Sequence, residues 1–131
     1  MQNERAQILA LYDELVSEKL YQFPPKREHL PKEVTSAHGV YIIYGADGQV
    51  LHVGKSSRGK RGVFQRLMNH LAGQSSFVNL YFKGDKTQVR ACGFRFLSID
   101  DARTRALVEA YATGYLCPAH IGLNETVKIS N

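Results

Sequence analysis

The chain has 131 residues, of which 44% are hydrophobic and 22% are charged, and its formal net charge is +5 at pH 7. This length fits one domain with a core of its own, and the composition is that of a globular protein rather than a disordered chain. No run approaches the roughly 18 apolar residues of a membrane helix, and the polar first residues differ from a signal peptide, so we expect a cytoplasmic protein without a membrane partner.

The first segment of the chain, residues 4–21, carries apolar side chains at helical spacing. These side chains are Ile8, Leu9, Leu11, Tyr12, Leu15, Val16 and Leu20. The pattern predicts an amphipathic helix that packs on the domain. A proline-rich stretch follows over residues 23–31 and breaks regular structure, because proline removes a backbone donor and fixes φ. We therefore divide the chain into an N-terminal helix with a Pro-rich linker, residues 1–33, and a second unit, residues 34–131.

The second unit begins with two segments typical of β-strands, Gly39–Tyr44 and Val50–Gly54. Both are rich in β-branched and aromatic residues, and Asp47-Gly48 lies between them. An Asp-Gly pair favours the tight turn of a β-hairpin. We therefore predict a hairpin over roughly residues 38–54.

A basic loop over residues 56–62 and a helix over roughly residues 63–72 are predicted next. This region has one sign of charge, since Gly48 to Gly84 contains no acidic residue. Its basic residues are Lys55, Arg58, Lys60, Arg61, Arg66 and Lys83. Proteins bind phosphate backbones through such footprints, although a solvated basic face has the same pattern. Charge alone leaves both interpretations open.

The last third of the chain predicts two strands and a helix. Phe77–Phe82 and Val89–Leu97 resemble strands, and Asp100 or Asp101 is expected to cap a helix that ends at Pro118. The element order predicts an α/β fold of the layered α+β kind. In that fold a small mixed or antiparallel sheet of about three strands is flanked by helices, with an extra N-terminal helix.

The cysteines and histidines, which bind metals through sulfur and nitrogen, are not spaced in the sequence as metal ligands usually are. Cys92 and Cys117 can form at most one disulfide, and neither lies in a Cys-x-x-Cys motif, so we expect two buried, reduced thiols and no zinc site. His29, His38 and His120 are likewise expected to be surface or structural residues.

Five short motifs stand in the order found in the GIY-YIG nuclease superfamily, which the chain resembles over roughly residues 38–124. The motifs are Gly39-Val-Tyr41, His52-Val-Gly54-Lys-Ser56, Arg66-Leu-x-x-His70, Glu109, and Pro118 with Leu123-Asn124. No single motif is specific, but the five motifs in this order, together with the basic loop, make a fairly strong match. The resemblance implies hydrolysis of phosphodiester bonds with one divalent ion, Mg²⁺ or Mn²⁺. The chain departs from the family at His52, where the family usually has tyrosine, and in a longer connection before Arg66.

The resemblance also implies a role for each matched residue. Glu109 is expected to be the metal ligand, since a carboxylate oxygen suits Mg²⁺. From spacing alone, an exposed glutamate paired with Arg105 would be the simpler interpretation. Arg66 is expected to bind phosphate through its guanidinium, and His70 to contact phosphate or base.

Two further residues are candidates for handling the attacking water. Tyr41 either accepts a proton, for which a phenol with an ordinary pKa of about 10 needs a nearby cation, or only orients the water. His52, whose imidazole ordinarily titrates near neutral pH, either acts as a general base or orients Tyr41 or a phosphate oxygen. Tyr44, on the same strand as Tyr41, is assigned a structural role.

The remaining matched residues are assigned to substrate binding or support. Lys55 is expected near the scissile phosphate, and the loop residues Arg58, Lys60 and Arg61 on the nucleic-acid backbone. The supporting residues are Gly39, Gly54 and Asn124.

The leading hypothesis is therefore a metal-dependent endonuclease acting on DNA. The main alternative is a catalytically impaired nucleic-acid-binding module on the same scaffold, and a third is a domain for small molecules or proteins whose motif matches are accidental. No second DNA-reading motif is recognisable, so specificity would come from DNA structure or a partner. The oligomeric state stays open.

Overall fold

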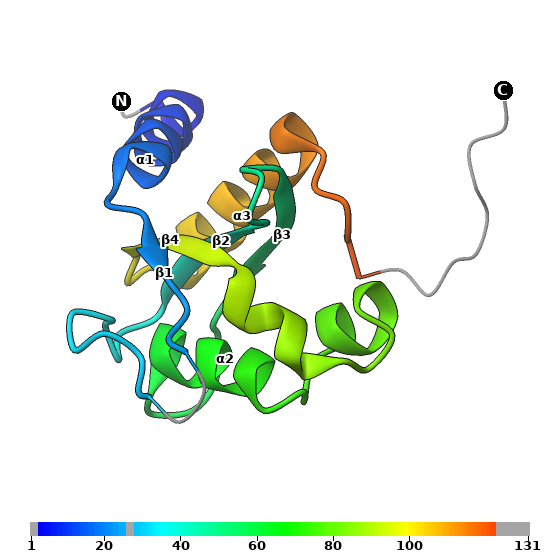
Figure 1. Cartoon of the computed structure of the whole chain (residues 1–131). Helices are drawn as coiled ribbons and strands as arrows, with labels where there is room; N and C mark the ends of the chain where they lie inside the picture. Colours follow the sequence, from blue (N-terminus) through cyan, green and yellow to red (C-terminus); the bar gives the residue numbers. More distant parts are fainter. Residues whose placement is uncertain (1–2, 26–27, 123–131) are drawn as a thin grey trace, which may run out of the picture.

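A computed structural model of the chain describes residues 3–25 and 28–122 (Figure 1). Four strands and several helices alternate along it. In chain order the elements are α1 (Glu4–Ser17), β1 (Tyr21–Gln22), β2 (Gly39–Tyr44), β3 (Val50–Lys55), α2 (Gly62–Leu71), the π-helical turn η1 (Phe77–Tyr81), the 3₁₀ helix η2 (Lys86–Ala91), β4 (Gly93–Ser98) and α3 (Ala102–Leu116).

The strands form one antiparallel sheet in the order β1-β4-β2-β3. The predicted layered α+β class with an extra N-terminal helix is thereby confirmed. The sheet has four strands rather than about three, because Tyr21 and Gln22 pair with Phe94 and Gly93 of β4. For the same reason the first helix ends at Ser17 and not near residue 21.

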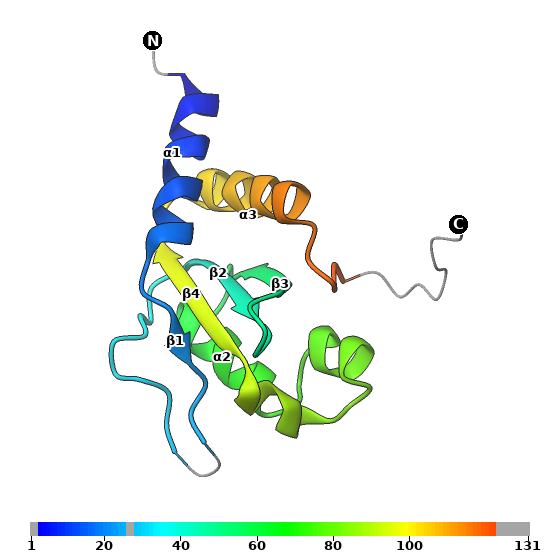
Figure 2. The same cartoon turned by 45° about the horizontal axis from the view of Figure 1, so that its top comes forward.

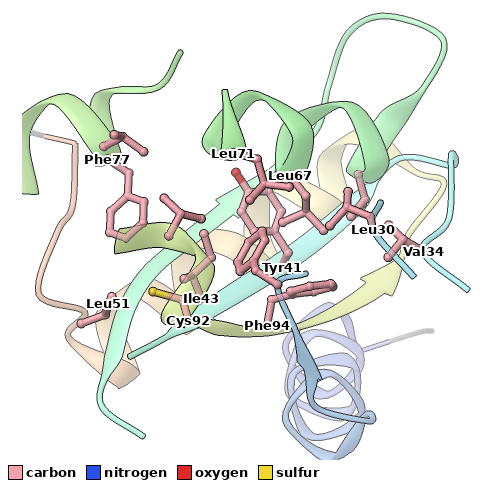
Figure 3. Close-up of a cluster of buried hydrophobic side chains, with 14 residues drawn as sticks. Leu30, Val34, Tyr41, Ile43, Leu51, Leu67, Leu71, Phe77, Cys92 and Phe94 are labelled. Carbon is pink, nitrogen blue, oxygen red and sulfur yellow. The ribbon is translucent and has the colours of Figure 1, made fainter. Parts of the chain in front are cut away.

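Helices cover both faces of the sheet, with α2 on one side and α1 and α3 on the other (Figures 1 and 2). Successive side chains of a strand point to opposite faces, so β2 supplies residues to two cores. Tyr41 and Ile43 lie in the core on the α2 side, where Leu67 packs against them (Figure 3). Val40 and Ile42 lie in the core on the side of α1 and α3.

Helix α1 is part of the second core through Ile8, Tyr12 and Leu15, which are all buried. Its first turn is capped by the side chain of Asn3 and tied to α3 by an ion pair between Glu4 and Arg103. The helix over residues 4–17 thus packs on its own domain, as its apolar stripe predicts.

The predicted strand over Phe77–Phe82 is wrong, since this segment is the π-helical turn η1. The hydroxyl of Ser75 accepts a hydrogen bond from the Val78 N–H and starts the turn. Phe77 and Val78 are completely buried by packing, so their apolar character serves the core rather than a sheet. A short apolar run does not by itself distinguish these two cases.

The predicted strand over Val89–Leu97 is correct only from Gly93 onward. The residues before it form η2, because the Asp85 carboxylate caps that helix by accepting the Thr87 N–H. A buried Val89 therefore belongs to a helix and not to the sheet.

Helix α3 begins at the predicted cap, where the Asp101 carboxylate accepts the Thr104 N–H. It ends at Leu116, and the capping residue Cys117 adopts a left-handed conformation with φ 49°. Cys92 is buried as expected, but the expectation of a buried Cys117 is wrong, because a helix terminus leaves its side chain exposed. Within residues 3–25 and 28–122, none of the helices combines the length and apolar character needed to span a bilayer.

Candidate active site

A pocket of about 600 Å³ opens at the side of the sheet between β3, α2 and α3. Five of the residues predicted as site residues from the sequence line it, and they come from four elements. They are Tyr41 of β2, His52 and Lys55 of β3, Arg66 of α2 and Glu109 of α3. Gly54, predicted as a supporting residue, forms part of the wall. Residues separated by up to 68 positions in sequence thus share one cavity.

Tyr41 is the most deeply placed residue of the pocket, with no exposed surface. Its phenol oxygen lies 2.8 Å from Nε2 of His70. Burial raises the pKa of Tyr41 to about 12, while the charge of Arg66 and a hydrogen bond from it act in the opposite direction. Tyr41 is therefore a neutral phenol at physiological pH.

Gly54 allows Tyr41 to reach this position. A Cβ atom at residue 54 would overlap the phenol oxygen and the ring carbon that carries it. A residue with any side chain would push the phenol away from His70. Gly39 has a comparable role at the start of β2, where a Cβ atom would collide with the backbone carbonyl of Leu97.

His70 lies behind Tyr41 and does not line the pocket. It is completely buried, and its Nδ1 lies 2.8 Å from the hydroxyl of Ser75. Burial holds the pKa of His70 well below its usual value, with smaller contributions from His52 and Arg66. Its imidazole is therefore neutral, and the predicted direct contact with phosphate or base is replaced by a contact with Tyr41.

His52 stands in a cluster of rings at the pocket wall. Its ring stacks on Phe77 at a centroid distance of 5.0 Å and lies 5.3 Å from the rings of His70 and His120. Burial, together with the neighbouring charges of His120 and Arg66, lowers the pKa of His52 to about 3. Its Nδ1 is buried without a hydrogen-bond partner among the described residues.

Glu109 forms an ion pair with Lys55 in the pocket, with Oε1 3.5 Å from the ammonium nitrogen. Both side chains keep roughly a third of their surface exposed, at 27% and 32%. The alternative pairing of Glu109 with Arg105 is wrong. Arg105 is buried and donates from Nη1 to the carbonyls of Ile99 and Asp100, at 2.9 and 3.0 Å.

The basic loop lies beside this pocket, between β3 and α2. Arg58, Lys60 and Arg61 are all exposed. The guanidinium of Arg61 lies 4.6 Å above the Phe64 ring, which orients it at the start of α2. The loop joins Lys55 to the helix that carries Arg66, and both of those residues line the pocket.

His120, which the sequence left as a surface or structural residue, is a buried structural residue of this region. It is buried against His52 because the chain after α3 pairs with β3, where the His120 N–H donates to the Leu51 carbonyl at 2.8 Å. The same pairing brings Ile121 and Gly122 to the pocket wall. A single histidine after Pro118 carries no sequence signal for this contact. Asn124, predicted as a supporting residue, lies outside the described residues.

The donor set at this pocket fits a hydrated Mg²⁺ or Mn²⁺ ion. No group of three His, Cys, Asp or Glu side chains suited to a metal exists within the part of the chain that the structure describes. Mg²⁺ does not require one, since it commonly keeps several waters and takes one or two carboxylates plus substrate phosphate. Glu109 supplies one carboxylate, and the cavity has room for the waters.

No protein-family model and no curated protein matches the chain. The resemblance to GIY-YIG nucleases is therefore a hypothesis that rests on the order of the motifs. The geometry adds a separate observation, namely that Tyr41, His52, Gly54, Lys55, Arg66 and Glu109 line the same cavity, whereas His70 and Gly39 do not.

Replacing Gly54 by alanine should lower the free energy of unfolding by about 1–3 kcal/mol, because the new methyl group overlaps the Tyr41 phenol. Gly114→Ala is the matched control, since Gly114 lines the same pocket but its Cβ would meet open space. In the interior of α3 that change should stabilise by roughly 0.5–1 kcal/mol. Urea denaturation measures both, and equal effects would contradict the packing of Tyr41 on Gly54.

The free energy of unfolding should fall as the pH drops from about 6.5 toward 3. In that interval unfolded His52 takes up a proton at its ordinary pKa of 6.5, whereas the folded pKa is about 3. The stabilisation is thus complete above the unfolded pKa and is lost on acidification. His52→Phe should reduce the slope of stability against pH, and exposed His29→Gln should not. Urea denaturation at several pH values would refute the burial of His52 if both variants kept the wild-type slope.

Proposed function

We propose that the protein is a divalent-metal-dependent endonuclease of the GIY-YIG type, which hydrolyses phosphodiester bonds in DNA in the cytoplasm. The observation that carries the proposal is the convergence of Tyr41, Arg66 and Glu109 on one pocket beside a basic loop. A phenol, a guanidinium and a carboxylate are the groups needed to orient water, bind phosphate and hold a metal ion.

The cationic side chains would bind the substrate. Arg66 offers a planar fork of donors for two phosphate oxygens, and Lys55 offers a point charge in the same pocket. Arg58, Lys60 and Arg61 extend this positive surface along the DNA backbone. Because such contacts carry no base information, we infer selection by DNA structure or a partner rather than strong sequence specificity.

Tyr41 and His52 are the residues that would act on the attacking water. Tyr41 is held by His70 at the floor of the pocket that Arg66 also lines, where its oxygen can orient a water. Of the two roles considered for His52, orientation is the better supported, because an imidazole with a pKa of about 3 accepts a proton poorly. Its ring lines the pocket and is stacked on Phe77, which restricts its orientation.

Glu109 is the residue that would hold Mg²⁺ or Mn²⁺. When bound, the ion supplies charge neutralisation for the phosphate and the leaving oxygen. In the free protein Lys55 forms an ion pair with the Glu109 carboxylate. A bound phosphate would give this lysine a second anionic partner.

The second candidate is a nucleic-acid-binding module that has lost the reaction. The Lys55–Glu109 ion pair favours it, since a carboxylate neutralised by lysine is a poorer metal ligand. Supercoiled plasmid incubated with Mn²⁺, with and without a chelator, separates the two candidates. Nicking that the chelator stops supports the enzyme, and binding without nicking supports the module.

Glu109→Gln should abolish cleavage while leaving the fold and most of the DNA affinity intact, because it removes the metal ligand but no phosphate contact. Plasmid nicking and fluorescence anisotropy measure the two properties. Glu14→Gln, an exposed change on α1, is the control and should cleave like wild type. Mg²⁺-dependent cleavage by Glu109→Gln would reject the assigned metal ligand.

Neutralising the basic loop with Arg58→Gln, Lys60→Gln and Arg61→Gln should weaken DNA binding and its salt dependence. Each lost phosphate contact reduces the slope of log affinity against log salt by about 0.9 for duplex DNA. The control with equal net charge is Arg5→Gln, Lys32→Gln and Lys86→Gln, which changes exposed residues elsewhere. Titrations at several salt concentrations measure the slope. If the DNA affinity of the wild-type protein did not change with salt concentration, phosphate recognition would be excluded.

A further inference from the structure

Lys55 and Glu109 form an ion pair that joins two packed elements of the fold. Lys55 is the last residue of β3, and Glu109 lies in the middle of α3, which packs against that strand (Figure 1). The ammonium nitrogen lies 3.5 Å from Oε1 of Glu109. Within residues 3–25 and 28–122, no other cationic side chain pairs with this carboxylate. The carboxylate assigned to the metal ion thus already has a cationic partner.

The backbone of Lys55 is held firmly at the end of β3. Lys55 pairs with Val40 of β2 in the sheet. The next residue, Ser56, is buried and forms two hydrogen bonds with Gly39. The Ser56 N–H donates to the Gly39 carbonyl, and the Ser56 hydroxyl accepts the Gly39 N–H, both at 3.0 Å. Any displacement of the ammonium group therefore comes from the flexible four-carbon side chain of Lys55.

The surroundings of the ion pair let that side chain change partners. Lys55 and Glu109 keep 32% and 27% of their side-chain surfaces exposed, and an ion pair with this much solvent contact contributes little stability. Both residues line the pocket together with Arg66. A phosphate group that enters the pocket therefore meets both the guanidinium of Arg66 and the ammonium group of Lys55.

Lys55 opposes the binding of a second cation to Glu109. Two cations within a few ångströms of each other repel. Metal binding to Glu109 therefore weakens or breaks the ion pair, and the metal affinity is lower than that of the same carboxylate without a lysine. A phosphate that binds Lys55 removes this penalty. Phosphate and metal then each raise the affinity for the other, since coupling between two sites is reciprocal.

We propose that Lys55 makes metal binding depend on DNA: it holds the Glu109 carboxylate in the free protein and releases it when a DNA phosphate enters the pocket. The result is a low metal affinity in the free protein and a higher one in the DNA complex. This inference rests on the proposed function for its DNA substrate, and the competition between Lys55 and the metal ion is measurable without any cleavage.

Titration calorimetry with Mn²⁺ on the whole chain tests this competition in the absence of DNA. Lys55→Met should bind Mn²⁺ about 2- to 5-fold more tightly than wild type, the range expected from a partly exposed ion pair. Glu109→Gln should remove this gain, so the variant that carries both changes should bind no more tightly than Glu109→Gln alone. A gain of the same size without Glu109, or no gain in Lys55→Met, would overturn the proposal.

Arg66→Met is the matched control, because it removes a positive charge from the same pocket and leaves the Lys55–Glu109 ion pair in place. It should raise the Mn²⁺ affinity less than Lys55→Met does. Equal gains in the two variants would indicate a general effect of charge and would contradict the specific role of Lys55.

The coupling to DNA is measured by fluorescence anisotropy with a duplex whose phosphorothioate linkages resist hydrolysis. At constant ionic strength, Mn²⁺ should tighten DNA binding by the wild type about 2- to 5-fold more than it tightens binding by Lys55→Met. Equal effects of Mn²⁺ on the two proteins would contradict the release of Glu109 by DNA. Plasmid nicking is scored separately, and coupling without nicking would reject the nuclease function while the role of Lys55 stands.

Discussion

Burial of β2 on both of its faces is the constraint on which the rest of this structure depends. Because helices cover each side of the sheet, the alternating side chains of this strand fill two separate cores. Tyr41 is one of these core residues and also a lining residue of the pocket. The phenol is therefore held in place by packing, and Gly54 leaves the space that its oxygen occupies.

The electrostatics of the pocket follow from the same burial. His52 and His70 lose their affinity for protons because the core excludes water, so both remain neutral donors and acceptors at physiological pH. The charged groups Lys55 and Glu109 stand nearer the surface, where each keeps part of its hydration. The pocket thus has neutral groups at its floor and charged groups nearer the surface.

The limits of sequence reasoning show in particular segments. Gly39–Tyr44 was predictable as a strand because its β-branched and aromatic run is long and follows a glycine, and the Asp101 cap was predictable from its side-chain chemistry. Phe77–Tyr81 has a similar apolar content but forms a helical turn, because contacts with Ser75 and the ring cluster decide its conformation. The neighbourhood of His120 depends on a backbone pairing with β3 that no local pattern encodes.

By itself, the sequence determined the layered α+β class, the hairpin, the basic loop and the residue types available for chemistry, since these depend on local periodicity, turn chemistry and charge. Only the tertiary structure decided that Glu109 faces Lys55 and not Arg105, that His70 supports Tyr41 from behind, and that His52 is buried among rings. Those contacts join elements far apart in the chain. Their energies arise from packing and desolvation, which act only once the sheet and its covering helices have come together.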